Sequence, residues 1–138
     1  MKRILLLIVL LSVLSCKQKI TEADISNLNG YWEIEKVELP DGDKKEYKVN
    51  ETIDFFKIEA SKGFRKKVMP QLDGTYLTND IQEEVVIVVK DGSATIQYKT
   101  NYASWNEEII ELTKDKLVVK NQQELEYHYK RPVKFSVK

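Results

Sequence analysis

Few residues in this sequence carry the groups that enzymes use for acid, base or nucleophilic chemistry. His128 is the only histidine in the chain, and it lies between Glu126 and Lys130 in a segment that alternates polar and apolar residues. That alternation predicts an outward, solvated imidazole. The adjacent acids Glu83-Glu84 and Glu107-Glu108 would point to opposite faces of a strand, so neither pair can converge as an acid–base dyad. We therefore predict no catalytic residue and no enzymatic activity.

The sequence also offers few residues that could bind a metal ion or a cofactor. Cys16 is the only cysteine, so a zinc site would have to be built from one imidazole and carboxylates. The sequence holds no glycine-rich phosphate loop and no Gly-x-Ser-x-Gly elbow. Asp41, Asp73 and Asp91 each precede a glycine, and turn formation accounts for them. We predict no metal ion and no cofactor.

Aromatic side chains are the groups best suited to binding, since many fall on faces that the alternation places inward. One interpretation is that they only fill a core, because aromatic residues bury large areas in any small domain. The other is that some line a pocket in which tyrosine hydroxyls orient a mostly apolar ligand. The candidate ligand-binding residues are Trp32, Phe56, Ile96, Tyr98, Trp105 and Tyr127.

The first residues have the layout of an export signal. Lys2 and Arg3 precede an apolar run of eleven residues, 4–14. A spanning helix needs about 20, so this run is too short for a permanent anchor. It ends at Val13-Leu14-Ser15-Cys16, which resembles the lipobox of bacterial lipoproteins. The resemblance implies a signal peptide at 1–15, cleavage before Cys16 and lipid attachment to its sulfur. The alternative is an ordinary secretory peptide with a chance cysteine.

Residues 16–28 are expected to form the lipidated N-terminus and a polar tether that ends in a short helical turn. A dozen extended residues reach about 40 Å, so the domain could stand off the membrane. Two or more acyl chains anchor a protein lastingly, which makes the lipid bilayer one expected partner. Lys17 replaces the aspartate that retains some lipoproteins at the inner membrane, and no acidic cluster follows. We expect an outer-membrane protein whose domain faces the periplasm.

Charge excludes one class of partner. Cleavage before Cys16 would leave 123 of the 138 residues, and loss of Lys2 and Arg3 would leave 20 basic against 22 acidic side chains. A net charge of about −2 argues against nucleic acid as a partner. The basic runs Lys44-Lys45 and Arg65-Lys66-Lys67 are interpreted as solvated faces.

The remainder of the chain, 29–138, predicts one all-β domain. Asp-Gly pairs at 41–42, 73–74 and 91–92 separate segments rich in β-branched and aromatic residues, which is typical of hairpin turns. Eight or nine short strands are expected, with no helix longer than a turn or two. Their ranges are 30–39, 53–60, 63–69, 74–78, 84–90, 93–100, 105–113, 116–121 and 124–131.

Breaks in the alternation favour a closed sheet. The apolar phase switches within 30–39, 53–60 and 105–113, and such switches indicate the bulges or bends that barrel strands need. The run 85–89 is apolar on both faces and would be prone to aggregation on an open edge. Short hairpin loops then predict an up-and-down antiparallel barrel. An open two-sheet sandwich is the alternative.

A resemblance to lipocalins rests on both ends of this domain. The stretch Asn29-Gly30-Tyr31-Trp32 resembles the Gly-x-Trp that opens the lipocalin barrel, and Tyr129-Lys130-Arg131 resembles its closing arginine. Asp73-Gly74-Thr75-Tyr76 and residues 109–119 are similar to the small lipocalin-like lipoproteins of bacterial envelopes. The resemblance spans roughly 28–132 and implies that Gly30, Trp32 and Arg131 close the barrel. The domain is shorter than a typical lipocalin, so its interior is either a cavity or filled by side chains.

Two functions from different classes follow. The first is a membrane-tethered lipocalin-like lipoprotein that binds or carries a small apolar ligand in the cell envelope. The second is a structural or interaction lipoprotein whose barrel is solid and whose outer surface contacts an envelope protein. Sequence alone does not separate them, because interior volume depends on side-chain packing.

Overall fold

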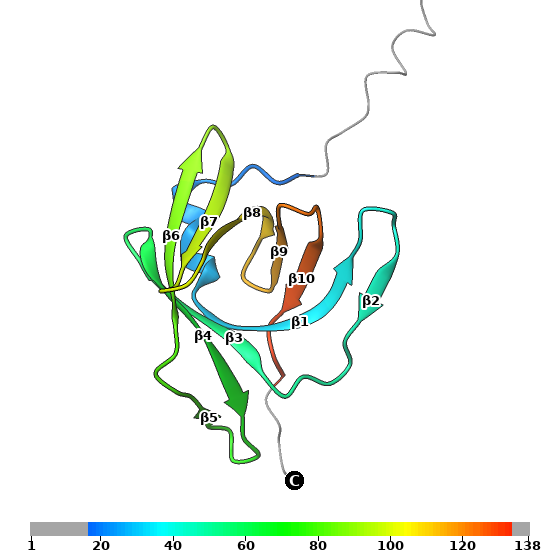
Figure 1. Ribbon diagram of the computed structural model, residues 1–138, viewed down its shortest axis with the longest axis vertical. Helices are drawn as coiled ribbons and strands as arrows, with labels where there is room; N and C mark the ends of the chain where they lie inside the picture. The colour runs from blue at the N-terminus through cyan, green and yellow to red at the C-terminus, as the bar shows by residue number, and fades with distance from the viewer. Residues whose placement is uncertain (1–16, 134–138) are drawn as a thin grey trace, which may run out of the picture.

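The computed structural model describes residues 17–133, so the predicted signal peptide, lipobox and lipidated Cys16 lie outside the described residues. The described chain is a closed antiparallel β-barrel (Figure 1). Each strand pairs with the next one around the ring, and β10 pairs with β1 to complete it. The predicted all-β barrel is confirmed. The open sandwich is wrong, because the first and last strands share five paired positions.

Eight strands form the barrel and two lie outside it. The barrel strands, in their order around the ring, are β1 (Gly30–Glu38), β3 (Ile53–Glu59), β4 (Lys62–Pro70), β6 (Glu83–Lys90), β7 (Ser93–Lys99), β8 (Ser104–Leu112), β9 (Lys116–Lys120) and β10 (Glu126–Lys130). The short strand β2 (Lys44–Glu46) pairs with β1, and β5 (Tyr76–Leu77) pairs with β4. The sequence did not predict β2, because three charged residues carry no strand signal.

Two of the three predicted phase switches are real irregularities. The register of β1 on β10 shifts between Ile34 and Lys36, and that of β8 on β9 shifts between Ile109 and Glu111. The switch predicted in 53–60 is wrong, because β3 pairs with β4 without a break. The prediction failed because Phe55 is apolar but lies on the outer face, with its ring centroid 4.8 Å from that of Tyr31.

The segment before β1 docks on the barrel. Gln18 exchanges side-chain hydrogen bonds with the backbone of Leu112, and Ile20 donates its N–H to the Gly92 carbonyl at 2.8 Å. The Ile20 side chain is buried in the core. Residues Glu22–Leu28 form the predicted short helix, a 3-10 helix η2 that also packs on the core through Ile25 and Leu28. The expected extended tether is therefore wrong from Gln18 onward, since burial of Ile20 and its strand-like pairing fix this stretch.

The core is continuous from η2 into the barrel. Its fully buried large side chains include Trp32, Leu28, Ile96, Tyr98 and Ile109. Val85 and Ile87 of the doubly apolar strand β6 point into this core. Ring closure removes the edges that such a strand would otherwise expose. Among residues 17–133, no helix has the length and apolar content needed to cross a membrane.

One end of the barrel is closed by Arg131 and Trp32. The Arg131 guanidinium lies over the Trp32 indole, with Cζ 3.6 Å from the ring centroid. It donates hydrogen bonds to three backbone carbonyls, those of Asn27 (2.8 Å), Tyr31 (3.0 Å) and Lys114 (2.7 Å). The Trp32 indole N–H donates to the Leu28 carbonyl at 2.8 Å. These contacts confirm the closure implied by the lipocalin resemblance.

Gly30 is required where the chain enters this closure. Its φ is +106°, a value that side chains with a Cβ rarely adopt. A Cβ at this position would also lie 3.1 Å from a terminal nitrogen of Arg131. The glycine two residues before the tryptophan thus leaves room for the arginine that covers the tryptophan.

We predict that Arg131→Lys lowers the free energy of unfolding by about 1–2 kcal/mol, because lysine keeps the charge but loses the planar stacking and the three-carbonyl fork. Trp32→Ala should cost about 3–5 kcal/mol by leaving a cavity. Chemical denaturation of both single variants and the double variant gives the coupling between the two side chains. Effects that add within about 0.5 kcal/mol would contradict an energetic contact.

Candidate functional site

The opposite end of the barrel is open and contains a cleft. The loops at this end are residues 47–52, 71–82, 100–103 and 121–125, between the strands defined above. The cleft, here called the mouth cleft, has a volume of about 440 Å³. It is lined by residues of β1, β3, β4 and β10 and by the loop before β3: Trp32, Ile34, Val37, Tyr47, Val49, Asn50, Glu51, Thr52, Ile53, Asp54, Lys67, Tyr127 and Tyr129.

A buried carboxylate belongs to the lining of the mouth cleft. Asp54 is only 3 % exposed, and it pairs across the strands with Trp32 on one side and Lys67 on the other. Lys67 Nζ lies 2.6 Å from Asp54 Oδ1 as an ion pair, yet within residues 17–133 this oxygen has no partner with hydrogen-bond geometry. The Lys67 side chain is 62 % exposed, so the buried carboxylate is paired with a lysine that lies largely in solvent.

The loop before β3 is both anchored and exposed at the mouth of the cleft. Asn50 in the loop before β3 donates hydrogen bonds to Glu33 Oε1 and to the Ile34 carbonyl, both at 3.0 Å. These bonds hold the loop across the outside of β1. Val49 beside it is 87 % exposed. The loop is therefore attached at one point and open to solvent next to it, which suits an entrance.

Below the mouth, the barrel interior contains an arginine bound by acids, here called the Arg65 cluster. The Arg65 guanidinium forms two hydrogen bonds with Glu83, at 2.8 and 2.7 Å, and lies 3.9 Å from Glu107 Oε1. It also stacks over the Tyr98 ring, with Cζ 4.1 Å from the centroid. Its side chain is 11 % exposed. Charge-assisted, two-point pairing of this kind is what makes burial of an arginine tolerable.

Burial sets the electrostatics of the cluster. Desolvation raises the pKa of the Glu107 carboxyl above its ordinary value, against the lowering effects of Tyr98 and Arg65. Desolvation likewise raises the pKa of the Tyr98 and Tyr129 hydroxyls, so both stay protonated and can donate hydrogen bonds. For Arg65, burial opposes the charge, but Tyr98 and the bond with Glu83 outweigh it and raise the pKa. The interior is thus a polar, partly charged environment.

The structure divides the predicted ligand-binding residues into two groups. Trp32 and Tyr127 line the mouth cleft. The others lie deeper in the barrel: Phe56, Ile96 and Tyr98 are buried core residues, and Trp105 stacks on Tyr98 with ring centroids 5.4 Å apart. These four support the walls rather than line the cleft, as the core-filling interpretation of the aromatic residues expected.

Sequence reasoning missed the polar members of the site. Asp54 was hidden between apolar neighbours, and Tyr47 lay in a segment with no predicted element. Arg65 was interpreted as part of a solvated basic run, which is wrong because the alternation of β4 turns it inward opposite Phe56 and Glu83. The signal that could have found it is the period-two pattern itself, which places position 65 on the same face as the close-packed Gly63.

Two further expectations about charged residues need correction. His128 is not a solvated imidazole, because its side chain is only 12 % exposed between Glu38 and Glu126. The sequence pairs Glu83-Glu84 and Glu107-Glu108 do not converge within themselves, but one member of each pair does converge with the other. Glu83 and Glu107 come from different strands, and each lies close to Arg65. Opposed strands of a closed sheet bring together residues that adjacent positions on one strand keep apart.

The raised pKa of Glu107 predicts a pH dependence. A carboxyl whose pKa is higher in the folded than in the unfolded state stabilises the fold below its unfolded pKa, and that contribution is lost as pH rises through the folded pKa. Glu107→Gln removes this titration. We expect the stability of the variant relative to wild type to improve as pH rises from about 4 to 7. Urea denaturation at a series of pH values measures it, and a difference independent of pH would show that burial does not shift this group.

Comparison with known proteins agrees with this geometry. The model of the lipocalin-like domain family matches residues 28–119, which is two thirds of the chain. Among curated proteins none matches.

Two solved structures are similar in outline. A lipocalin-like protein from Bacteroides uniformis has 12% sequence identity and a TM-score of 0.48, and the match covers 77% of this chain and 99% of that one. An uncharacterized protein from Bacteroides eggerthii has 13% identity and a TM-score of 0.48, with 76% and 99% covered. The family model covers two thirds of the sequence, and the closed barrel with its Trp32–Arg131 contact agrees with a lipocalin-like fold. The chain belongs to the lipocalin-like domain family.

Proposed function

We propose that this protein is a lipid-anchored binding protein of the cell envelope, which holds a small amphipathic ligand in the mouth cleft. The observation that carries the proposal is the cleft of about 440 Å³ that reaches the buried carboxylate of Asp54 between aromatic walls. Small-molecule sites are usually of about 300–1,000 Å³, with apolar walls and a few polar groups that fix orientation. A lipocalin-like barrel is a ligand-binding type of domain, which supports the same function.

The lining suggests the shape of the ligand. Trp32, Val37 and Tyr127 offer surface for an apolar or aromatic body. Asp54 offers a carboxylate whose present partner, Lys67, is an exposed side chain. A ligand that carries an ammonium group, or another strong hydrogen-bond donor, would replace Lys67 and complete the hydrogen bonding of that carboxylate. We therefore propose an apolar body with a cationic head, which adds a charge to the small, mostly apolar ligand expected from the sequence.

The anchor would orient the cleft. Gln18 and Ile20 are bound beside Leu112 and Gly92, at the end of the barrel that Arg131 closes. If Cys16 carries lipid, only Lys17 separates the anchor from this docked segment. The closed end would then lie against the outer membrane and the mouth cleft would face the periplasm. Figure 1 shows the N-terminal segment running past the β6–β7 turn, away from the β5 end of the molecule.

A second function is favoured by an apolar surface. Several large apolar side chains near the open end are exposed, on β4, β5 and the loops that flank β5: Met69, Leu72, Leu77 and Ile81. Exposed apolar patches mark interaction sites in many proteins. The alternative function is accordingly an interaction lipoprotein that contacts an envelope protein through this surface.

Matched probes test the ligand class. We expect a chain beginning at Lys17 to bind octylamine more tightly than octanoate, because the two share a tail and differ in the charge of the head. Asp54→Asn should weaken octylamine binding about tenfold, which corresponds to roughly 1.4 kcal/mol, and leave octanoate unchanged. Isothermal titration calorimetry measures both affinities.

Asp80→Asn is the control, since Asp80 is an exposed loop aspartate outside the cleft lining. Equal binding of the two probes, or equal loss in both variants, would exclude a cation-selective cleft. Absence of binding by either probe would leave the interaction lipoprotein as the better proposal.

Lipidation has its own test in cells. We expect Cys16→Ala to abolish incorporation of labelled palmitate and to leave an uncleaved precursor, because the lipobox-like motif would lack its acceptor sulfur. Metabolic labelling followed by immunoprecipitation measures the modification. Ser15→Ala is the control and should be processed as wild type. Palmitate on the Cys16→Ala protein would refute the anchor.

A further inference from the structure

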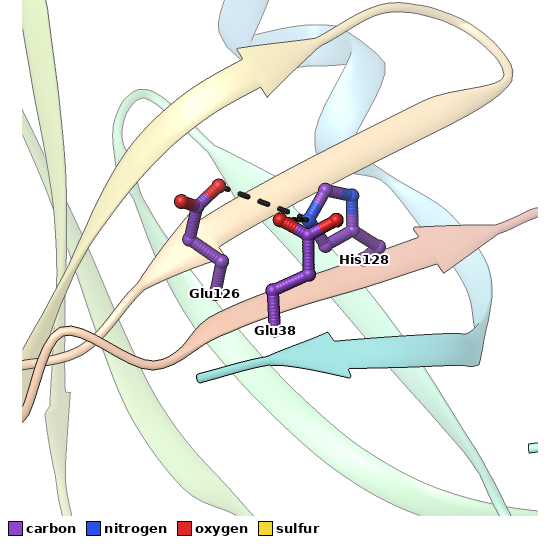
Figure 2. A group of neighbouring side chains, drawn as sticks. All are labelled: Glu38, Glu126 and His128. Atoms are coloured by element: carbon purple, nitrogen blue, oxygen red, sulfur yellow. Dashed lines mark ion pairs between the residues drawn. The ribbon is translucent and has the colours of Figure 1, made fainter. Parts of the chain in front are cut away.

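Three side chains of residue types that coordinate metals in other proteins meet on the outer face of the barrel, on the side of β1 and β10 opposite to the one that lines the mouth cleft. Glu38 ends β1, and Glu126 and His128 lie on the neighbouring strand β10. In the register of these strands Glu38 is opposite Glu126, and His128 is two pairs further along, opposite Lys36. Alternation places all four on the same outward face. Figure 2 shows the imidazole and the two carboxylates directed toward one another.

The imidazole nitrogen of this group lacks a hydrogen bond. His128 Nε2 is buried, lies 3.6 Å from Glu38 Oε2 and 3.7 Å from Glu126 Oε1, and has no hydrogen-bond partner within the described chain. These separations exceed the 2.7–3.2 Å of an N–H···O bond. A buried polar atom without a partner is costly, so the arrangement is incomplete as it stands.

The same separations fit a shared cation. Ligand atoms about 2.0–2.2 Å from a tetrahedral Zn²⁺ ion are about 3.3–3.6 Å from one another. The candidate ligand atoms of Glu38, Glu126 and His128 all lie within 4.8 Å of one another. Small side-chain rotations would bring them to coordination distance, and the two partly exposed carboxylates leave a fourth position open to water.

The surrounding charges are compatible with this occupant. Lys36 Nζ binds the other oxygen of Glu38, Oε1, at 3.0 Å and leaves Oε2 to face the imidazole. Lys44 is paired with Glu46 on β2. Two carboxylates and a neutral imidazole would balance the two charges of the ion, which would compete with Lys36 for Glu38.

We propose that Glu38, Glu126 and His128 form a surface site for a divalent transition-metal cation, with Zn²⁺ as the representative ion. One imidazole and two carboxylates with an open fourth position is a donor set that zinc accepts. The ligand of this site is independent of the ligand of the mouth cleft, so the proposal does not rest on the proposed function.

Zinc binding to the full-length protein, purified in detergent without a histidine tag, tests the site. We expect one Zn²⁺ per chain by calorimetry near neutral pH. Because His128 is the only histidine, its Nε2 resonance in a nitrogen-labelled sample should shift on addition of Zn²⁺. Glu126→Gln and His128→Ala should each weaken binding at least tenfold. Lys36→Met should strengthen it several-fold, because the lysine competes for Glu38.

The control is Glu84→Gln, an exposed strand glutamate outside the cluster, which should bind zinc as wild type does. Circular dichroism confirms that each variant is folded, and Glu38→Gln replaces any variant that is not. An Nε2 signal that responds to pH but not to zinc would overturn the proposal in favour of a simple ion pair. Zinc binding that survives both Glu126→Gln and His128→Ala would overturn it as well.

Discussion

The structure depends most on the stacking of Arg131 over Trp32, which joins the first and last segments of the barrel domain. One guanidinium binds carbonyls from the segment before β1, from β1 itself and from the β8–β9 turn, so it ties together segments about 100 residues apart. Loss of chain entropy opposes such long-range closure. Stacking on a fully buried indole, together with three charge-assisted hydrogen bonds, offsets part of that cost. Closure in turn leaves no open edge between β1 and β10.

The interior of this barrel contains polar groups as well as apolar ones. Eight strands enclose a space that side chains can just fill, and here part of the filling is Arg65 with two glutamates and Tyr98. Buried ion pairs of this kind seldom add stability over apolar packing, because desolvation is expensive. Their presence next to Asp54 and below an open cleft indicates that the interior is arranged for more than stability. At the closed end Arg131 donates to three carbonyls, whereas Asp54, whose Oδ1 has no hydrogen-bond partner within residues 17–133, belongs to the lining of the mouth cleft.

The sequence predicted the fold better than the site, for a physical reason. Turns, alternation and terminal motifs are local, and the Asp-Gly pairs, the bulges near Ile34 and Ile109 and the Trp32–Arg131 closure all followed from them. The site depends on which strands face one another across the barrel. Arg65 reaches Glu107 from β4 to β8, and no spacing along the chain encodes that approach. The docking of Ile20 was missed for the same reason, since one apolar residue in a polar segment carries little signal.

The β1–β10 seam connects the two ends of the molecule and both of its proposed ligands. Val37 pairs with Tyr127 inside the barrel, and both line the mouth cleft. The neighbouring pair Glu38 and Glu126 points outward with His128. A cation held there would join the two strands next to the wall of the cleft, far along the seam from Arg131. The bulge between Ile34 and Lys36 lies between the Arg131 closure and the Glu38–Glu126–His128 group. It is therefore the stretch of the β1–β10 pairing that neither contact holds. The same strand pair therefore carries the lining of the mouth cleft on its inner face and the proposed metal ligands on its outer face.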